Sequence, residues 1–272
     1  MSARGVVATL RVECAKLSAQ VKVWAVLVTC LAGPFAFATA IKVQSSLPED
    51  TLFGRSVKAS GFAVPLVVLG FAASWGFPVL TSVVGGDLFS SEDRYGTWST
   101  LLTRSRTRGE LFAGKVLTAL TFSLLAVAVL AVGCLLAGVL VIGRQPLLGL
   151  SGTQIEPGRS LMLVLAAWGS VLPPVFAFTA LAVLLSVATR SSAAGIGLPV
   201  LVGFAMELTS FVNGPEVLRR VLLTPPFVAW HGLFTEHPYY GPLVEGAAIS
   251  GAFFVGCLAA AYRIMGERDA GG

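Results

Sequence analysis

The chain has 272 residues, of which 55% are hydrophobic and only 12% charged, and its mean hydropathy is +0.82. Soluble domains carry about 25% charged residues, so this composition excludes a soluble protein and indicates an integral membrane protein. The net charge of +5 does not indicate nucleic-acid binding, because the basic residues lie in short clusters between apolar runs and form no continuous stripe.

The residues near the start predict an amphipathic helix over 4–20. Apolar side chains recur there at spacings of three or four from Val6 to Leu17. Its charged residues fall elsewhere on the helical wheel, so we expect this helix to lie at a membrane interface. No clear secretory signal with a cleavage site is seen. The apolar run 21–41 is therefore the first predicted membrane span, with a kink expected at Pro34.

The second predicted span is 61–84, and it is followed by a segment too polar to cross a bilayer, residues 85–115. This central segment holds much of the chain's charge and separates two long apolar runs. When it is placed on a helix, Leu88 and Trp98 share one side, and Asp93 falls opposite them. We therefore predict an amphipathic helix there, outside the bilayer.

Three further spans are predicted at 116–142, 161–189 and 193–212. The first of them has 27 residues, more than a hydrocarbon core of about 30 Å requires at ~1.5 Å per residue, so we expect it to tilt or project. The second is interrupted by Pro173-Pro174. A short connection at Arg190 leads into the third, which predicts a helical hairpin.

The loop 213–243 is long, yet it keeps apolar pieces that a fully solvated loop would not need. We expect one or two short helices there that dip into the outer membrane interface, with Trp230, Tyr239 and Tyr240 at the level of the headgroups. The sixth span is 244–264. The predicted fold class is an all-α polytopic membrane protein, a single transmembrane domain over 1–272 with an N-terminal interfacial helix, six spans and a re-entrant outer loop.

The distribution of positive charge predicts the topology. Six spans place both termini on one side of the membrane. Twelve of the 19 Lys and Arg residues fall on that side, several of them in the central segment, and seven fall on the other. The positive-inside rule then predicts a multi-pass protein of the cell membrane with both termini in the cytoplasm.

The central segment also contains an ordered series of residues: Glu92-Asp93-Arg94-Tyr95-Gly96-Thr97, then Leu101-Leu102, Arg106, Leu111 and Gly114-Lys115. This series resembles the cytoplasmic loop of ABC type-2 transporter permeases, whose pattern is Glu-x-x-x-Gly-Thr, Leu-Leu, Pro-x-Ser-Arg and Leu-x-x-Gly-Lys. The match is close over 85–115, and the six-span layout extends it loosely to the whole chain. One departure is visible, because Thr103-Arg104-Ser105 stands where the family usually has a proline.

The resemblance implies a permease subunit of an ATP-driven exporter of a hydrophobic or amphipathic substrate. The amphipathic segment would be a coupling helix that docks on a cytoplasmic ABC ATPase subunit. A second permease subunit, identical or paralogous, and the membrane lipid would be the other partners. ATP and Mg²⁺ would be bound by the ATPase subunit, so no cofactor is expected in this chain. The residues expected to form the contact are Glu92, Asp93, Arg94, Tyr95, Gly96, Thr97 and Trp98.

Other motifs do not fit the contexts that enzymes require. The stretch from Gly109 to Lys115 matches Gly-x-x-x-x-Gly-Lys, but Val116 replaces the Ser or Thr that would hold magnesium, and no strand precedes it. Two histidines in the outer loop, His231 and His237, lack a convincing third ligand, so no metal site is predicted. We therefore do not expect the chain to be an enzyme by itself.

An ionisable residue inside a span is a functional candidate, because its charge costs about 2–3 kcal/mol at mid-membrane. Glu207 is such a residue. It could reach the outer headgroups or pair locally, or it could belong to a substrate path. Side chains that could line such a path, and that could equally serve helix packing, are Trp75, Phe77, Phe204 and Met206.

Two other classes of membrane protein are alternatives to the permease. A secondary carrier that needs no ATPase would be expected to place several ionisable or broken-helix sites at mid-membrane, where Glu207 is the single candidate. An intramembrane enzyme acting on lipid would need a convergent acid–base or metal cluster, and the sequence suggests none.

Overall fold

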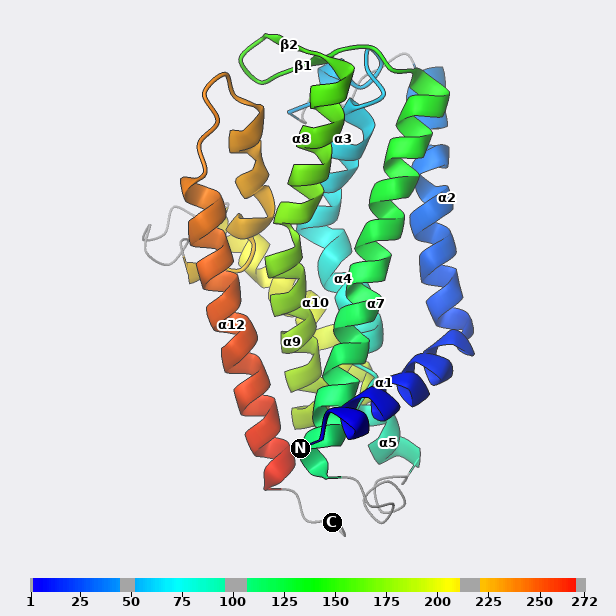
Figure 1. Cartoon of the computed structure of the whole chain (residues 1–272), viewed down its shortest axis with the longest axis vertical. Coiled ribbons are helices and arrows are strands. Elements are labelled where there is room, and N and C mark those ends of the chain that lie inside the picture. The colour runs from blue at the N-terminus through cyan, green and yellow to red at the C-terminus, as the bar shows by residue number, and fades with distance from the viewer. Residues whose placement is uncertain (1, 45–51, 96–106, 211–220, 268–272) are drawn as a thin grey trace.

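The computed structural model describes residues 2–44, 52–95, 107–210 and 221–267. Figure 1 shows a bundle of long helices that run side by side. A small β-hairpin lies at one end of the bundle, which we call the hairpin end. The first helix and the end of the last helix lie at the other, which we call the α1 end.

Within the described residues, five helical segments are long and apolar enough to cross a membrane. They are α2 (Val21–Val43), α7 (Arg108–Ala137) with the π-helix η3 (Gly138–Ile142), α8 (Pro157–Ser170) with α9 (Leu172–Thr189), α10 (Ser192–Ser210) and α12 (Gly241–Gly266). They correspond to five of the six predicted spans. The prediction of an all-α polytopic membrane protein is therefore confirmed.

The second predicted span is helical along its length, but it is not a uniform α-helix. It consists of α3 (Ala63–Phe71), the π-helix η2 (Ala72–Gly76) and α4 (Phe77–Gly85), with 9, 5 and 9 residues. Pro78 near the start of α4 has no amide hydrogen, so a regular α-helical bond cannot form at that position. The π turn immediately before it accommodates this break.

The helix that contains the third predicted span is longer than that span, and the start of the span in the membrane stays a prediction. Helix α7 begins at Arg108 rather than at residue 116, because Thr107 and Glu110 form a capping box in which each side chain accepts a hydrogen bond from the other's backbone N–H. The polar side chains of this first part are turned into the protein instead of into solvent. The fourth span is broken at Val171, next to the predicted proline pair, and Arg190 with a φ of 53° turns the chain from α9 into α10.

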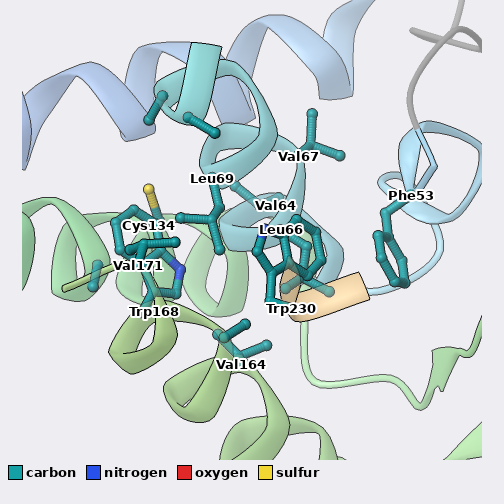
Figure 2. Close-up of a cluster of buried hydrophobic side chains, with 14 of the residues drawn as sticks. Phe53, Val64, Leu66, Val67, Leu69, Cys134, Val164, Trp168, Val171 and Trp230 are labelled. Carbon is teal, nitrogen blue, oxygen red and sulfur yellow. The ribbon is translucent and has the colours of Figure 1, made fainter. Parts of the chain in front are cut away.

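A large hydrophobic core, with aromatic and aliphatic side chains, reaches the hairpin end (Figure 2). The antiparallel strands β1 (Leu147–Leu148) and β2 (Gln154–Ile155) and the 3₁₀-helix η1 (Gly54–Ser56) lie there. A second 3₁₀-helix, η4 (Pro225–Phe234), packs against α8 and α12. Its Phe234 meets Phe53 edge to face, with ring centroids 5.2 Å apart.

The placement of Trp230 at headgroup level was wrong. Its side chain is only 1% exposed and packs against Phe53 and Phe234, because the loop places Leu223, Phe227 and Leu233 in the same core. Tyr239 and Tyr240, in contrast, are more than half exposed. Re-entry of the loop into the membrane stays a prediction, and its part at 213–220 lies outside the described residues.

Candidate functional site

The α1 end holds a buried network of charged side chains that come from three helices. Helix α1 (Ala3–Ser18) supplies Glu13 and Lys16, the short helix α5 (Ser90–Tyr95) supplies Glu92, and α7 supplies Lys115. The Lys115 side chain is 1% exposed, and its ammonium donates to the Glu92 carboxylate at 3.0 Å. The same ammonium lies 3.2 Å from the carboxylate of Glu13.

Backbone and aromatic groups complete the surroundings of Lys115. Its ammonium donates to the backbone carbonyl of Leu88 at 2.9 Å and lies 5.7 Å from the centre of the Phe89 ring. A buried charge is costly unless it is paired and hydrogen-bonded, and this arrangement meets that condition. Lys115 therefore joins the start of α7 to the segment that leads into α5.

Lys16 makes the network electrically balanced. Its ammonium lies 3.0 Å from a carboxylate oxygen of Glu13 and 3.0 Å from one of Glu92, so two lysines face two glutamates. Partial burial disfavours the charged form of Lys16, but the hydrogen bonds and charges of Glu13 and Glu92 outweigh this effect and raise its pKa above the ordinary value of 10.5.

A second ion pair lies beside the network, between Lys22 of α2 and Asp87 just after α4. A pocket of about 40 Å³ separates the two groups of charges and is lined by Gln20 and Ser91 among others. Since a single water needs about 10–15 Å³ by this measure, the pocket has room for only a few waters. It is too small to be a substrate site.

A close helix crossing holds α1 against α7. A Cβ atom added at Gly114 would lie 2.5 Å from the Cβ of Thr9, and one at Gly5 would lie 2.5 Å from the carboxyl carbon of Glu110. Glu110 also accepts a hydrogen bond from the backbone N–H of Ser2 at 2.7 Å. The pair Gly114-Lys115 therefore has two structural roles: the glycine lets the helices approach, and the lysine reaches the carboxylates that this approach brings near.

Helix α5 is fixed on its other side by serines. The hydroxyl oxygen of Ser186 in α9 accepts hydrogen bonds from the backbone N–H groups of Phe89 and Ser90, at 3.4 and 3.1 Å. The hydroxyl of Ser90 in turn lies 3.1 Å from that of Ser192, at the start of α10. Together with the ion network, these bonds connect α5 to α1, α7, α9 and α10. The segment around α5 is therefore bonded to three of the long apolar helices.

The seven predicted contact residues have different positions. Glu92 is 6% exposed and points into the ion network. Asp93, Arg94 and Tyr95 complete the backbone of α5, but the structure does not describe their side chains, and Gly96, Thr97 and Trp98 lie outside the described residues. Glu13, Lys16 and Lys115 are not among the residues predicted for the site. The capping pattern at Thr107 would have placed Lys115 in a helix, but its partners could not be inferred from local pattern.

The residues suggested for a substrate path do not form one lining. Trp75 and Phe204 lie together, with ring centroids 5.1 Å apart, and both are partly exposed on the side of the bundle. Phe77 is fully buried and packs instead on Phe227, with ring centroids 5.5 Å apart. Packing therefore accounts for Phe77.

The two other candidates for the path lie near the end of α10. Met206 packs against the core, and Glu207 is partly exposed, one turn from the end of that helix. Participation of any of these residues in transport stays a prediction.

The nucleotide-binding alternative is disfavoured by local structure. Gly109 to Lys115 forms the first turns of α7, where backbone N–H groups bond within the helix, rather than a loop that could surround a phosphate.

The loop histidine His231 has the environment of a partly buried residue. Burial lowers the pKa of His231, which packs beside Trp230 at a ring-centroid distance of 4.2 Å. Its environment is that of a packed aromatic residue.

The bundle of long apolar helices, with a short helix bound by ion pairs at one end, is that of a polytopic membrane protein. The family model described as ABC-2 family transporter protein matches residues 9–206, which include the second half of α1, the ion network and most of α10. The chain belongs to this family, and the resemblance of residues 85–115 to ABC type-2 permeases is confirmed. No curated protein matches the chain.

Proposed function

We propose that this chain is the permease subunit of an ATP-driven exporter, and that a separate cytoplasmic ATPase subunit docks on α5 and the residues that follow it. The membership in the ABC-2 family supports a partner of that kind. In this proposal the α3–η2–α4 segment is the second span and brings the number of spans to six, both termini lie in the cytoplasm, and a second permease subunit completes the path.

One observation carries the proposal, namely that α5 is held rigidly between helices of the bundle. The Lys115–Glu92 pair joins it to α7, and the Ser186 hydroxyl joins its start to α9. A short helix fixed at both sides transmits a push or a rotation with little loss, whereas a flexible loop would absorb it. This is the mechanical property that coupling to an ATPase requires.

The proposed substrate is hydrophobic or amphipathic. Support comes from the bundle surface near Trp75 and Phe204, where aromatic side chains are exposed on α3–η2–α4 and α10. The pocket beside the ion network is too small and too polar for such a molecule. Substrate would therefore pass between membrane-crossing helices and not through the ion network.

The docking proposal can be tested with the chain co-expressed with its ATP-binding subunit. We expect Arg94→Glu, on the last turn of α5, to reduce copurification of that subunit by about tenfold, the effect of ~1.4 kcal/mol. Arg159→Glu is the matched control, because Arg159 is an exposed arginine at the hairpin end. Equal copurification by the two variants would remove α5 as the docking site.

The transmission proposal requires a separate measurement, since docking and coupling can fail independently. Lys115→Gln with Glu92→Gln removes the ion pair between α5 and α7 but keeps polar groups at both positions. We expect this double variant to bind the ATPase subunit. In liposomes, the resulting complex should hydrolyse ATP but lose most of its substrate transport. Transport at the level of the unaltered protein would show that the pair does not transmit motion, and transport without any ATPase subunit would favour a secondary carrier.

A further inference from the structure

Helix α1 has two chemically different faces. The inward face is buried against α7 and the ion network, and its residues are Val6, Thr9, Glu13 and Leu17. The outward face is exposed, and its residues include Arg4, Val7, Arg11 and Val12. Because spacings of three and four residues fall on one side of a helix, Arg4, Val7 and Arg11 form a single stripe.

The charges of α1 are sorted between these faces. Its one acidic residue is Glu13, which is 5% exposed and bound to Lys115 and Lys16. Three carboxylates on neighbouring elements do not add negative charge to this face either, since Glu92 and Glu110 are both less than 10% exposed and Asp87 pairs with Lys22. Within the part of the chain that the structure describes, the outward stripe of α1 is thus positive and apolar, with no exposed carboxylate of α1 beside it.

The level of α1 along the bundle is set by its two connections. It crosses α7 where Gly5 meets Glu110 and Thr9 meets Gly114, and Figure 1 shows it running across the end of α7 rather than along it. After Lys115, α7 and η3 carry no charged residue up to Ile142. Helix α2, which follows α1, carries none between Lys22 and Lys42. Both neighbours change from charged to apolar sequence at the level of α1, which is where lipid headgroups begin.

An exposed tryptophan marks the same level. Trp24, in the first turn of α2, is 57% exposed, and its indole N–H donates to the backbone carbonyl of Ser18 at the end of α1. Tryptophan is enriched at membrane–water interfaces, where an apolar ring and a polar N–H are both satisfied. The position of Trp24 is therefore independent support for the location of α1 at the membrane interface.

We propose that the outward face of α1 binds the headgroups of anionic phospholipids. Arg4 and Arg11 bind phosphate oxygens through their guanidinium groups, which match phosphate geometry, while Val7 and Val12 contact the upper part of the acyl chains. A basic amphipathic helix held at this depth is attracted to a negatively charged bilayer surface. The outward face is selective for anionic lipid because Glu13, the acidic residue of α1, faces inward. This binding does not depend on the proposed ATPase docking.

The test uses the full chain in nanodiscs of phosphatidylcholine and phosphatidylglycerol, with a fluorophore on Val7→Cys and the native cysteines replaced. Trace lipid with a nitroxide on its headgroup quenches the fluorophore when it is close. We expect nitroxide phosphatidylglycerol to quench more than nitroxide phosphatidylcholine. We expect Arg4→Gln and Arg11→Gln each to lower this preference by about fivefold at low salt, the effect of one basic residue near an anionic surface.

Controls separate this effect from net charge and from misfolding. Arg144→Gln with Arg159→Gln removes two exposed arginines at the hairpin end and should leave the preference unchanged. Arg4→Lys with Arg11→Lys keeps the charges and should retain most of it. Equal quenching by the two lipids in the unaltered protein would overturn the proposal. So would the absence of quenching by either lipid, which would place this face against solvent or another protein.

Discussion

The ammonium of Lys115 and the carboxylate of Glu92 lie 3.0 Å apart, and neither side chain is more than 8% exposed. These residues belong to a membrane-crossing helix and to the short helix α5, which precedes it. Their contact, extended by Glu13 and Lys16 of α1, makes the α1 end a single fixed unit. In the proposed function, this unit is the part of the bundle on which the ATP-binding partner acts.

Removal of the central lysine should destabilise the protein. Lys115→Met leaves the carboxylates of Glu13 and Glu92 in a buried site. Their remaining ammonium partner in the network is Lys16, which is half exposed. Breaking a buried ion pair in this way costs about 3–5 kcal/mol. Thermal unfolding of the detergent-solubilised protein measures the loss. Lys58→Met, at an exposed site, should change stability by about 0.5 kcal/mol or less. Similar melting temperatures for the two variants would contradict a stabilising network.

The approach of α1 to α7 should depend on Gly114. Gly114→Ala introduces a methyl group 2.5 Å from the Cβ of Thr9, so the helices must separate, at a cost of about 1–3 kcal/mol. The reactivity of a cysteine placed at Thr9, a buried position, should rise as α1 loosens. Gly169→Ala is the matched control, because its added methyl meets no atom within 4 Å. Unchanged reactivity in Gly114→Ala would show that α1 tolerates the closer contact.

The docking of α1 should weaken at alkaline pH. The pKa of Lys16 is raised above 10.5 in the folded protein, so its stabilising contribution is fully present below 10.5 and is lost as pH rises through the folded value. Cysteine reactivity at Thr9 should therefore increase above about pH 10.5. In Lys16→Gln this part of the increase should disappear, because no proton remains to be released at that position. An identical pH profile in both proteins would assign the change to other groups.

The hydroxyl of Ser186 should hold the start of α5. Ser186→Ala removes the acceptor used by the N–H groups of Phe89 and Ser90, and burial of unpaired donors costs about 1–3 kcal/mol. Hydrogen exchange of the amides from 86 to 95 should become faster. Ser18→Ala, at an exposed hydroxyl that bonds within its own helix, should leave this exchange unaltered. Equal protection in both variants would mean that the ion network alone fixes α5.

The orientation in the membrane can be measured with two exposed positions at opposite ends of the bundle. A cysteine at Thr153, in the hairpin, should react with an impermeant thiol reagent added to intact cells, in a background without native cysteines. A cysteine at Glu267, after α12, should react only after permeabilisation, because the positive-inside rule places that end in the cytoplasm. The reverse pattern would invert the topology and remove the basis for ATPase docking on α5.

The amino-acid sequence by itself determined the class of fold. Apolar runs of about twenty residues are long enough to cross a bilayer and must be helical there, because a backbone in lipid has to satisfy its own hydrogen bonds. The order of residues from Glu92 to Lys115 also indicated the family, which the match over residues 9–206 confirmed.

Only the tertiary structure decided which polar residues face inward. Glu13 and Lys16 meet Glu92 and Lys115 from positions far apart in the chain. Periodicity within one segment indicates on which face of a helix a residue lies, but not which other element packs against that face. For the same reason, the pattern of the central segment predicted a solvated face, but the start of that segment is buried. The pattern of the loop at 213–243 predicted an interfacial Trp230, but its side chain lies in the core. Burial of a charge or a tryptophan is determined by partners that the fold brings together.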